Sequence, residues 1–218
     1  MKVLALETAT GRLSVAVLHD DHVLALVERD APGHHARHVI PLIDEAIRSA
    51  GAMLSALDGV AVSIGPGSFT GLRVGLATAL GFRLISGLPI ACVPTLEALA
   101  WRARGTASRL MPMLKARPGE VYWARYESRD GELRKMESER AGSVEQAVAA
   151  MPDGYVAVGE GWEGCAPLAA SAISVGELGI GRLRDGQIAG PDVSPYYVQR
   201  AEAEIRWDAR AALPGTGR

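Results

Sequence analysis

Short apolar runs alternate with helix-like segments along the first hundred residues. Residues 3–6, 14–18 and 22–29 have the apolar or alternating composition of β-strands, and a short turn separates the first two. Apolar positions then recur at three- and four-residue steps, which predicts a helix over residues 39–51. Pro41 lies within that run, so we expect it either to open the main helix or to kink it.

The next segment combines a strand, a glycine-rich loop and a helix. Residues 60–64 form an apolar, β-branched run, and residues 65–71, with the sequence GPGSFTG, predict a tight loop. From residue 72 to residue 85 the pattern is helical, with Ser68 or Thr70 as the expected N-cap.

The first half closes with one more strand and one more helix. Residues 89–93 predict the strand and residues 94–101 the helix. The resulting order β-β-β-α-β-α-β-α predicts a mixed sheet with helices on its faces. Residues 104–108 are polar, so we expect an N-terminal domain over residues 1–104 and a smaller C-terminal domain over residues 105–218.

A similar order of elements is predicted beyond that boundary. The predicted elements are strands over residues 110–114, 120–127 and 132–136, a helix over 144–151, a strand over 155–158 and a helix over 162–172. This repeated order suggests two related domains that face each other across a cleft. The pattern is poorly defined over residues 176–190, residues 196–198 predict a last strand, and residues 213–218 predict a frayed tail.

Composition narrows the class of protein. With 48% hydrophobic and 22% charged residues, the 218-residue chain has enough apolar side chains for a sizeable core. Its formal net charge of −2 argues against a protein that binds nucleic acid by itself. Cys92 and Cys165 lack metal-ligand spacing and are expected to be free thiols in a reducing compartment. The N-terminus has no signal-peptide pattern, so a cytoplasmic protein is predicted.

The glycine loop invites comparison with a phosphate-binding loop, because a helix N-terminus attracts anions. Residues 71–73 are Gly-Leu-Arg where a P-loop ends in Gly-Lys-Ser/Thr, so the favoured interpretation is that the glycines let the backbone turn and pack closely. No cofactor is expected, and the turn after the first strand is interpreted as a capping turn. The cofactor-binding candidates that we considered are Glu7, Thr8, Thr10, Gly159 and Gly161.

Few residues are candidates for metal ligands or for a catalytic nucleophile. His34 and His38 are four residues apart and could face the same way, but no third ligand is evident and His35 stands where an H-E-x-x-H site has Glu. A solvated helix start is therefore favoured, and no metal is expected. Ser68 does not lie in a G-x-S-x-G elbow, and Cys92 lies in an apolar strand, so no catalytic residue is predicted.

Taken together, these motifs resemble the TsaB family, also called YeaZ, along nearly the whole chain. The most specific is GPGSFTGLRVG at residues 65–75, after the strand at 60–64. The other segments that carry the resemblance are residues 4–10, 116–124, 158–162 and 195–198.

The resemblance implies an α/β fold of the ASKHA (actin-like ATPase) class, with two RNase H-like domains of which the second is reduced. It also implies a non-catalytic scaffold subunit of the machinery that attaches a threonylcarbamoyl group to the tRNA adenosine beside the anticodon. Such a subunit pairs with the catalytic TsaD and the ATPase TsaE, forms a homodimer when alone, and meets tRNA only through the complex. The alternative is an active ASKHA ATPase or an M22-type, glycoprotease-like peptidase.

Two departures from the family pattern stand out. Lys115 occupies a position where the family usually has Asp, which puts any role for that acid in doubt. Residues 176–191 look shorter than in typical relatives, which suggests that a helix of the second domain is missing.

The two helices of the first half are the expected partner interface. Small side chains at Gly71, Gly75, Thr78 and Ala79 share one face of the second helix, which would let a partner helix approach closely. A four-helix interface between two such pairs, residues 38–48 and 71–85, is therefore predicted, with Gly75→Glu or Val74→Arg expected to fold but stay monomeric. The predicted interface residues are His38, Leu42, Glu45, Ser68, Phe69, Thr70, Gly71, Val74, Gly75, Thr78 and Phe82.

Overall fold

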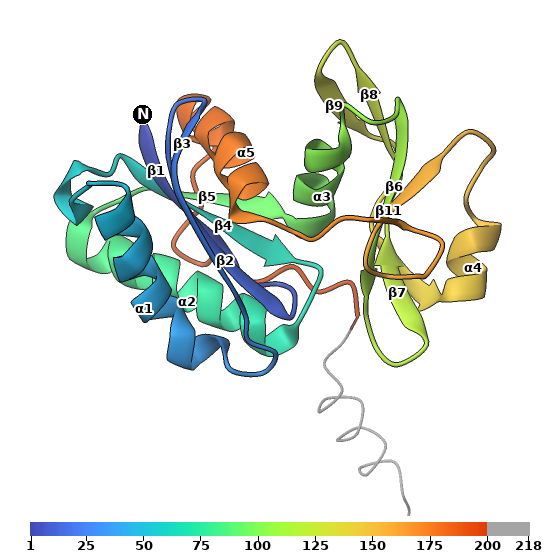
Figure 1. Ribbon diagram of the computed structural model, residues 1–218, viewed down its shortest axis with the longest axis horizontal. Helices are drawn as coiled ribbons and strands as arrows, with labels where there is room; N and C mark the ends of the chain where they lie inside the picture. The colour runs from blue at the N-terminus through green and yellow to red at the C-terminus, as the bar shows by residue number, and fades with distance from the viewer. Residues whose placement is uncertain (200–218) are drawn as a thin grey trace, which may run out of the picture.

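The chain folds into two α/β halves that lie side by side, each built on one β-sheet (Figure 1). The computed structural model describes residues 1–199. The predicted tail at residues 213–218 therefore lies outside the described residues. Among residues 1–199, no helix is both long and apolar enough to cross a membrane.

The sheet of the first half has five strands in the order β3-β2-β1-β4-β5. Strands β1, β2 and β3 are antiparallel neighbours, whereas β4 and β5 run parallel to β1. This is the mixed sheet that the predicted element order required. Its strands are β1 (Lys2–Glu7), β2 (Arg12–His19), β3 (His22–Asp30), β4 (Gly59–Gly65) and β5 (Ile90–Pro94).

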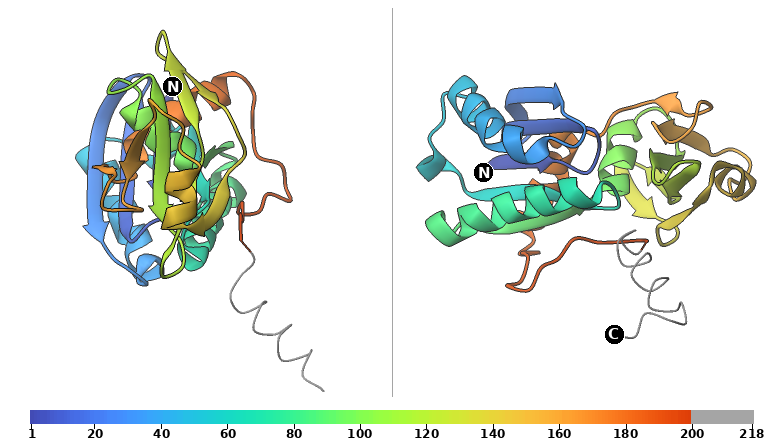
Figure 2. Two further views of the ribbon diagram at one scale, coloured as in Figure 1. Left: turned by 90° about the vertical axis from the view of Figure 1, so that its right-hand side faces the viewer. Right: turned by 90° about the horizontal axis from the view of Figure 1, so that it is seen from below.

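Helices cover both faces of this sheet (Figure 2). Helices α1 (His35–Ser49) and α2 (Phe69–Ser86) contact each other and bury a core against one face, while α5 (Ala172–Arg184) packs on the other face. Pro41 lies inside α1, and the short 3₁₀ helix Leu54–Ala56 follows that helix. The first-half elements agree with the predicted ones to within a few residues.

The second sheet repeats the strand order of the first. Its path is β10-β7-β6-β11-β12, with β8 pairing both β6 and β9. Because β7 and β8 both pair antiparallel with β6, they act as one interrupted strand, and β10 and β9 continue the sheet beyond them. The elements are β6 (Arg109–Lys115), β7 (Glu120–Trp123), β8 (Tyr126–Arg129), β9 (Glu132–Lys135), β10 (Arg140–Ser143), α4 (Val144–Ala149), β11 (Val156–Gly159) and β12 (Ala166–Pro167).

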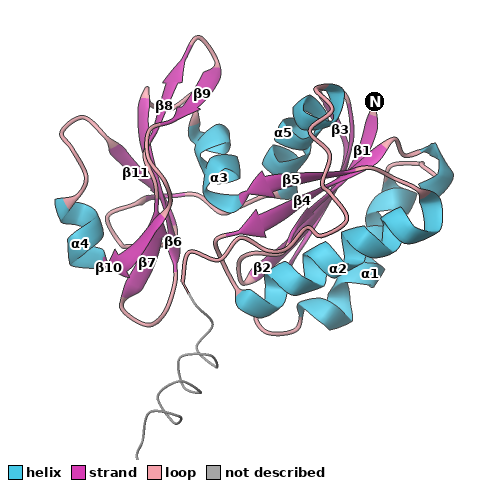
Figure 3. Ribbon diagram, turned by 180° about the vertical axis from the view of Figure 1, so that it is seen from behind, coloured by secondary structure: helices cyan, strands magenta, loops and turns pink. Residues whose placement is uncertain are grey.

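This repeated order confirms the predicted architecture of two RNase H-like halves with a reduced second half. Strand β11 runs parallel to β6, as β4 does to β1, and β12 runs parallel to β11. Helix α2 connects β4 to β5 in the first half, but only turns connect β11 to β12 (Figure 3). The second half is thus smaller by one helix.

Each half supplies a helix to the other. Helix α3 (Thr95–Ala103) follows β5 but also packs on β6, whereas α5 follows β12 and packs on β1 and β4. Between the two helices, the Trp101 indole donates to Glu177 at 2.6 Å, and Arg182 makes a bidentate pair with Glu97 at 2.7 and 2.8 Å. These contacts fix the two halves against each other.

Several predicted elements in the second half are wrong. No helix covers residues 162–171, where turns surround β12, because Gly164 packs under the Trp162 ring and β12 ends at Pro167. Residues 176–190 were expected to be poorly defined and to lack a helix, but they hold most of α5. The helix that the second half lacks is instead the one between β11 and β12. The single strand expected over residues 120–127 is interrupted at Ala124 and Arg125.

The C-terminal part of the described chain also differs from the prediction. Residues 196–198 form no strand, because Tyr196 makes only one backbone hydrogen bond to the first sheet, from its N–H to the Ile64 carbonyl. Helix α5 lies within residues 105–218, which were expected to form the C-terminal domain. It packs on the first sheet, however, and is therefore part of the first half in space. The division of the chain near residue 104 otherwise stays a prediction.

Residues 185–199, which we call the strap, run from α5 past α2 to the second half (Figure 2). The Arg83 guanidinium donates to the Ala189 and Gly190 carbonyls, both at 3.0 Å. At the far end, the Tyr196 hydroxyl donates to Glu139 and the Gln199 amide donates to Glu120. The chain passes between the halves after α3 and again before α5, and the strap is the third segment that connects them.

Candidate functional site

The glycine loop holds the start of α2 against the turn that follows β1. The Ser68 hydroxyl accepts a hydrogen bond from the Gly71 N–H at 3.2 Å, which confirms Ser68 as the N-cap. The Ser68 N–H in turn donates to the Ala9 carbonyl at 2.6 Å. Loop and turn are thus one unit, which positions both at the edge of the first half that faces the second.

The small residues of α2 face the chain's own interior. A Cβ atom at Gly71 would lie 2.0 Å from the Thr8 carbonyl oxygen, and one at Gly75 would lie 2.2 Å from Thr8 Oγ1. Both glycines are buried, and Leu42 of α1 is also fully buried in the core of the first half. The prediction that these three residues contact a partner is therefore wrong, because the small face of α2 packs against β1.

The other predicted interface residues lie at or near the surface. Val74 and Phe82 pack partly against the core of the first half. Glu45, Ser68 and Thr70 are exposed, whereas His38, Phe69, Val74, Thr78 and Phe82 are half-buried.

The sequence patterns missed the most exposed apolar side chains of the two helices. Ile40 of α1 is 57% exposed, and Leu84 and Ile85 in the last turn of α2 are 87% and 82% exposed. Ala77 is exposed on α2 as well. Helical spacing alone could have identified these side chains, because they lie outside the face of each helix that carries its buried residues.

Glu7 and Thr8 form a buried turn below the glycine loop. Glu7 is fully buried, and its Oε1 accepts a hydrogen bond from the Ala9 N–H at 2.6 Å. Thr8 and Thr10 were the expected caps of this turn, and of the two it is Thr10 whose Oγ1 accepts a backbone bond, from the Arg12 N–H at 3.3 Å. Burial raises the pKa of the Glu7 carboxyl to about 7, although the bonds from Ala9, Ser63 and Thr10 oppose the shift. Within residues 1–199, Glu7 Oε2 and Thr8 Oγ1 have no hydrogen-bond partner.

The histidines at the start of α1 are spread apart. His34 is exposed and precedes the helix, His35 is buried, and His38 Nδ1 lies 3.4 Å from an Arg29 guanidinium nitrogen. Burial lowers the pKa of His35. In the described part of the chain, no three His, Cys, Asp or Glu side chains cluster as a metal site requires.

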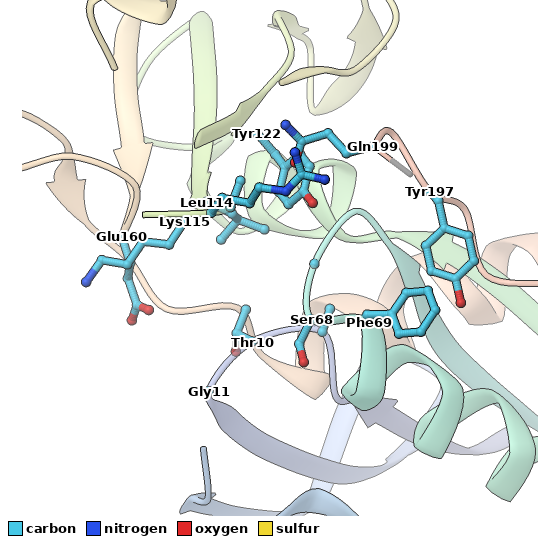
Figure 4. A pocket seen from close by; sticks show the side chains of 14 residues that line it. Thr10, Gly11, Ser68, Phe69, Leu114, Lys115, Tyr122, Glu160, Tyr197 and Gln199 are labelled. Carbon is cyan, nitrogen blue, oxygen red and sulfur yellow. The ribbon is translucent and has the colours of Figure 1, made fainter. Parts of the chain in front are cut away.

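A cleft of about 410 Å³ lies between the two halves. Figure 4 shows Thr10, Ser68 and Phe69 of the first half on one side, facing Leu114, Lys115 and Tyr122 of the second half. Ala9, Gly11 and Gly67 complete the first wall, Ala116, Arg117 and Glu160 the second, and Tyr197 and Gln199 of the strap border both. Of the cofactor candidates from the sequence, only Thr10 lines this cleft.

An aromatic stack stands at the rim of the cleft. The Phe69 and Tyr197 rings have centroids 5.0 Å apart, and the Arg73 guanidinium carbon lies 3.6 Å from the Phe69 centroid. Arg73 Nε also donates to the Tyr197 hydroxyl at 3.1 Å. This stack attaches the strap to the first turns of α2.

Gly159 and Gly161 serve close packing within the second half. Gly159 has a φ of +124°, and a Cβ there would lie 2.3 Å from the Met113 carbonyl oxygen of β6. A Cβ at Gly161 would lie 2.9 Å from the Met113 side chain. Both glycines let the turn after β11 pass directly over β6.

Comparison with known proteins places this architecture in one family. Residues 26–166, more than half of the chain, match the family model described as "TsaD: tRNA N6-adenosine threonylcarbamoyltransferase". The tRNA threonylcarbamoyladenosine biosynthesis protein TsaB of Escherichia coli is 33% identical over 91% of this chain and 87% of its own length. TsaB of Haemophilus influenzae is 29% identical over 99% of this chain and 98% of its own length.

Solved structures agree with these sequence matches. YeaZ from Pseudomonas aeruginosa superposes with a TM-score of 0.79 at 30% sequence identity, over 90% of this chain and all of that one. The strand order, the glycine loop and the near full-length similarity therefore lead to the same conclusion: this chain belongs to the TsaB (YeaZ) family of tRNA threonylcarbamoyladenosine biosynthesis proteins.

Proposed function

We propose that this chain is a non-catalytic partner subunit in tRNA threonylcarbamoyladenosine biosynthesis. It pairs with a TsaD-like transferase and a TsaE-like ATPase, and it forms a homodimer through the same surface when alone. The reaction takes place on its partners, and the chain meets tRNA only through the complex. The site of action is the cytoplasm.

The outer face of α1 and α2 carries this proposal. Ile40, Leu84 and Ile85 are more than half exposed on these helices. Burying such side chains against another chain contributes about 25 cal/mol for each Å² of apolar surface removed from water. Ile40 lies in the second turn of α1, and Leu84 and Ile85 lie in the last turn of α2. Large apolar side chains exposed on two neighbouring helices favour a protein–protein interface.

The side chains that were considered as catalytic candidates support the same proposal, because their contacts stabilise the fold. Glu7 holds the turn after β1, and Ser68 caps α2. His38 contacts Arg29, while His35 is buried below the start of α1. These contacts favour a structural role for each side chain over a role as nucleophile or general base.

Co-purification tests the proposed pairing. The chain is co-expressed with the TsaD-like and TsaE-like proteins of its own organism, and the retained partner is quantified. Ile40→Glu, Ala77→Glu and Leu84→Glu each place a charge on the outer face and are expected to reduce retention and homodimerisation at least tenfold. Each variant must keep the wild-type melting temperature.

Met136→Glu is the matched control, since Met136 is 41% exposed on the second half, away from both helices. It should retain the partner as the wild type does. Unchanged retention by all three helix variants would show that the interface lies elsewhere.

A further inference from the structure

We propose that a proton on the buried Glu7 carboxyl holds the glycine loop and the first turn of α2 in the geometry that a partner recognises, so that pairing depends on pH. This switch rests on the proposed partner role, since it regulates the helix that the outer face uses. Its parts are Glu7, the turn after β1 and the N-cap of α2.

Glu7 is a buried carboxyl without a compensating charge. Its side chain is fully buried at the end of β1, and its Oε2 has no hydrogen-bond partner within residues 1–199. Only burial and hydrogen bonds act on it, so no charged side chain of the described residues offsets a negative charge at this position. An unpaired carboxylate is costly to bury, and such a group takes up a proton instead.

Two opposing effects place this proton near neutral pH. Burial raises the pKa of Glu7, whereas the hydrogen bonds from Ala9, Ser63 and Thr10 lower it, and the result is a pKa of about 7. The same carboxyl in an unfolded chain would be ionised at that pH. A small change in pH around neutrality therefore changes the charge at the centre of the turn.

A chain of short hydrogen bonds leads from this carboxyl to α2. Glu7 Oε1 accepts from the Ala9 N–H at 2.6 Å, and the Ala9 carbonyl accepts from the Ser68 N–H, also at 2.6 Å. Ser68 then caps the helix through the bond from the Gly71 N–H to its hydroxyl. Ala9 is thus held between the titrating group and the residue that starts the helix.

Close packing transmits a movement of the turn to the helix. A Cβ atom at Gly67 would lie 2.3 Å from the Ala9 carbonyl oxygen, and one at Gly71 would lie 2.0 Å from the Thr8 carbonyl oxygen. Such a packed contact has no free space to absorb a shift. When Glu7 ionises and its carboxylate is solvated, the turn moves, and Phe69 and Thr70 at the start of α2 move with it.

The other titratable groups around the turn do not give this response. On α1, His35 bonds to the Thr10 backbone, and burial lowers its pKa from an ordinary 6.5, so it stays neutral at higher pH. The charged side chains of the remaining packed elements already have partners: Arg12 with Glu28, Arg73 with Phe69 and Tyr197, Glu177 with Trp101, Arg182 with Glu97, and Arg184 with Asp20.

Amide NMR of the free chain tests the switch without a partner. The ¹H–¹⁵N signals of Ala9, Ser68 and Gly71 are followed from about pH 6.5 to about pH 8.5. In the wild type we expect all three to shift together with a midpoint near 7, the pKa of Glu7. In Glu7→Gln, which keeps the acceptor but does not titrate, none should shift with that midpoint.

Binding of the TsaD-like protein to the immobilised chain tests the consequence for pairing. If only the protonated form is competent, the apparent dissociation constant rises as that form is depleted. For the wild type it should rise about tenfold between those two pH values. For Glu7→Gln it should change less than twofold, because any titration of the partner itself is common to both chains.

Glu132→Gln is the matched control, since Glu132 is an exposed carboxyl on β9 of the second half. It should keep the pH dependence of the wild type. Amide signals of Ser68 and Gly71 that do not titrate, or that titrate equally in Glu7→Gln, would overturn the switch, as would an equal change in affinity for both chains. A wild type that binds no partner at either pH would overturn the proposed pairing, while titrating amides would still assign loop control to Glu7.

Discussion

Thr8 at the end of β1 and Gly75 in the middle of α2 are in direct contact, and the absence of a side chain at Gly75 makes that contact possible. A Cβ atom at Gly75 would lie 2.2 Å from Thr8 Oγ1 and 3.2 Å from Thr8 Cβ. One turn earlier, Gly71 approaches the Thr8 carbonyl in the same way. The helix that the proposed interface uses is therefore fixed to the sheet by its glycines.

This contact predicts how glycines of α2 respond to substitution. Gly75→Ala should lower the free energy of unfolding by about 1–3 kcal/mol, because the added methyl overpacks a closed site. Gly71→Ala should cost at least as much, since it meets backbone and not a side chain. Urea denaturation of each variant measures the effect.

Gly81 of the same helix provides the control. A Cβ there would meet nothing within 4 Å, so Gly81→Ala should stabilise the protein by about 0.5–1 kcal/mol through helix propensity. If all three alanine variants shifted the stability alike, the close approach of α2 to Thr8 would be contradicted.

Glu7 predicts a pH dependence of stability. Its pKa is raised to about 7 by burial, from an ordinary value of 4.5, so the native state binds more protons than the unfolded state between those values. The free energy of unfolding should therefore fall as the pH rises from about 4.5 to about 7, by up to roughly 3 kcal/mol, and then level off.

Glu7→Gln isolates this contribution. The amide oxygen keeps the acceptor for the Ala9 N–H but does not titrate. The variant should be more stable than the wild type at pH 8 and nearly equal to it at pH 4.5, as measured by urea denaturation across that range. A wild type and variant that differ by a constant amount at every pH would refute the assignment.

Arg182 predicts how strongly α5 is held on the first half. Its guanidinium donates to the Cys92 carbonyl of β5 at 2.7 Å and pairs with Glu97 of α3, and its side chain is only 20% exposed. Arg182→Ala should lower the free energy of unfolding by about 2–4 kcal/mol, because it leaves Glu97 unpaired in a half-buried position.

Arg184, two residues further along α5, serves for comparison. It pairs with Asp20 at the surface, where both side chains are well exposed, so Arg184→Ala should cost less than about 1 kcal/mol. Thermal unfolding of both variants measures the difference. Equal shifts would mean that α5 is not anchored through Arg182.

The first half could be predicted because its periodicity is strong and its punctuation is clear. The apolar runs at residues 3–6 and 60–64 became β1 and β4, and Ser68 was recognised as a cap from its place before a helical pattern. The pattern could not show which segment packs against the small-residue face of α2. Gly71 and Gly75 look the same in sequence whether they admit another chain or, as found, Thr8 of this one.

Helix α5 was missed for a related reason. Gly176 and Gly179 lower helix propensity, which masked the three- and four-residue apolar spacing around them. In the fold they admit Leu18 and Ala61 of the sheet, whose atoms would lie 2.3 Å from an added Cβ. Ser171 before the helix and Arg182 in its last turn were usable signals.

Only some of the residues that line the cleft could be identified from the sequence. Thr10 and Ser68 stand out beside turns, but Lys115 and Gln199 come from distant segments that only the fold brings together. Residues 196–198 of the strap were predicted to be a strand because Tyr196 and Tyr197 favour extended structure. Their side chains instead contact Glu139 and Arg73, which lie in different halves.

Reconstituted modification of tRNA tests the central claim most directly. Transcribed substrate tRNA is incubated with the TsaD-like and TsaE-like proteins of the same organism, and threonylcarbamoyladenosine is quantified with and without this chain. The account predicts modification only when the chain is present, its loss with Ile40→Glu, and no ATP hydrolysis by the chain alone. Full modification without the chain, or full activity with the outer face of α1 and α2 disrupted, would contradict it.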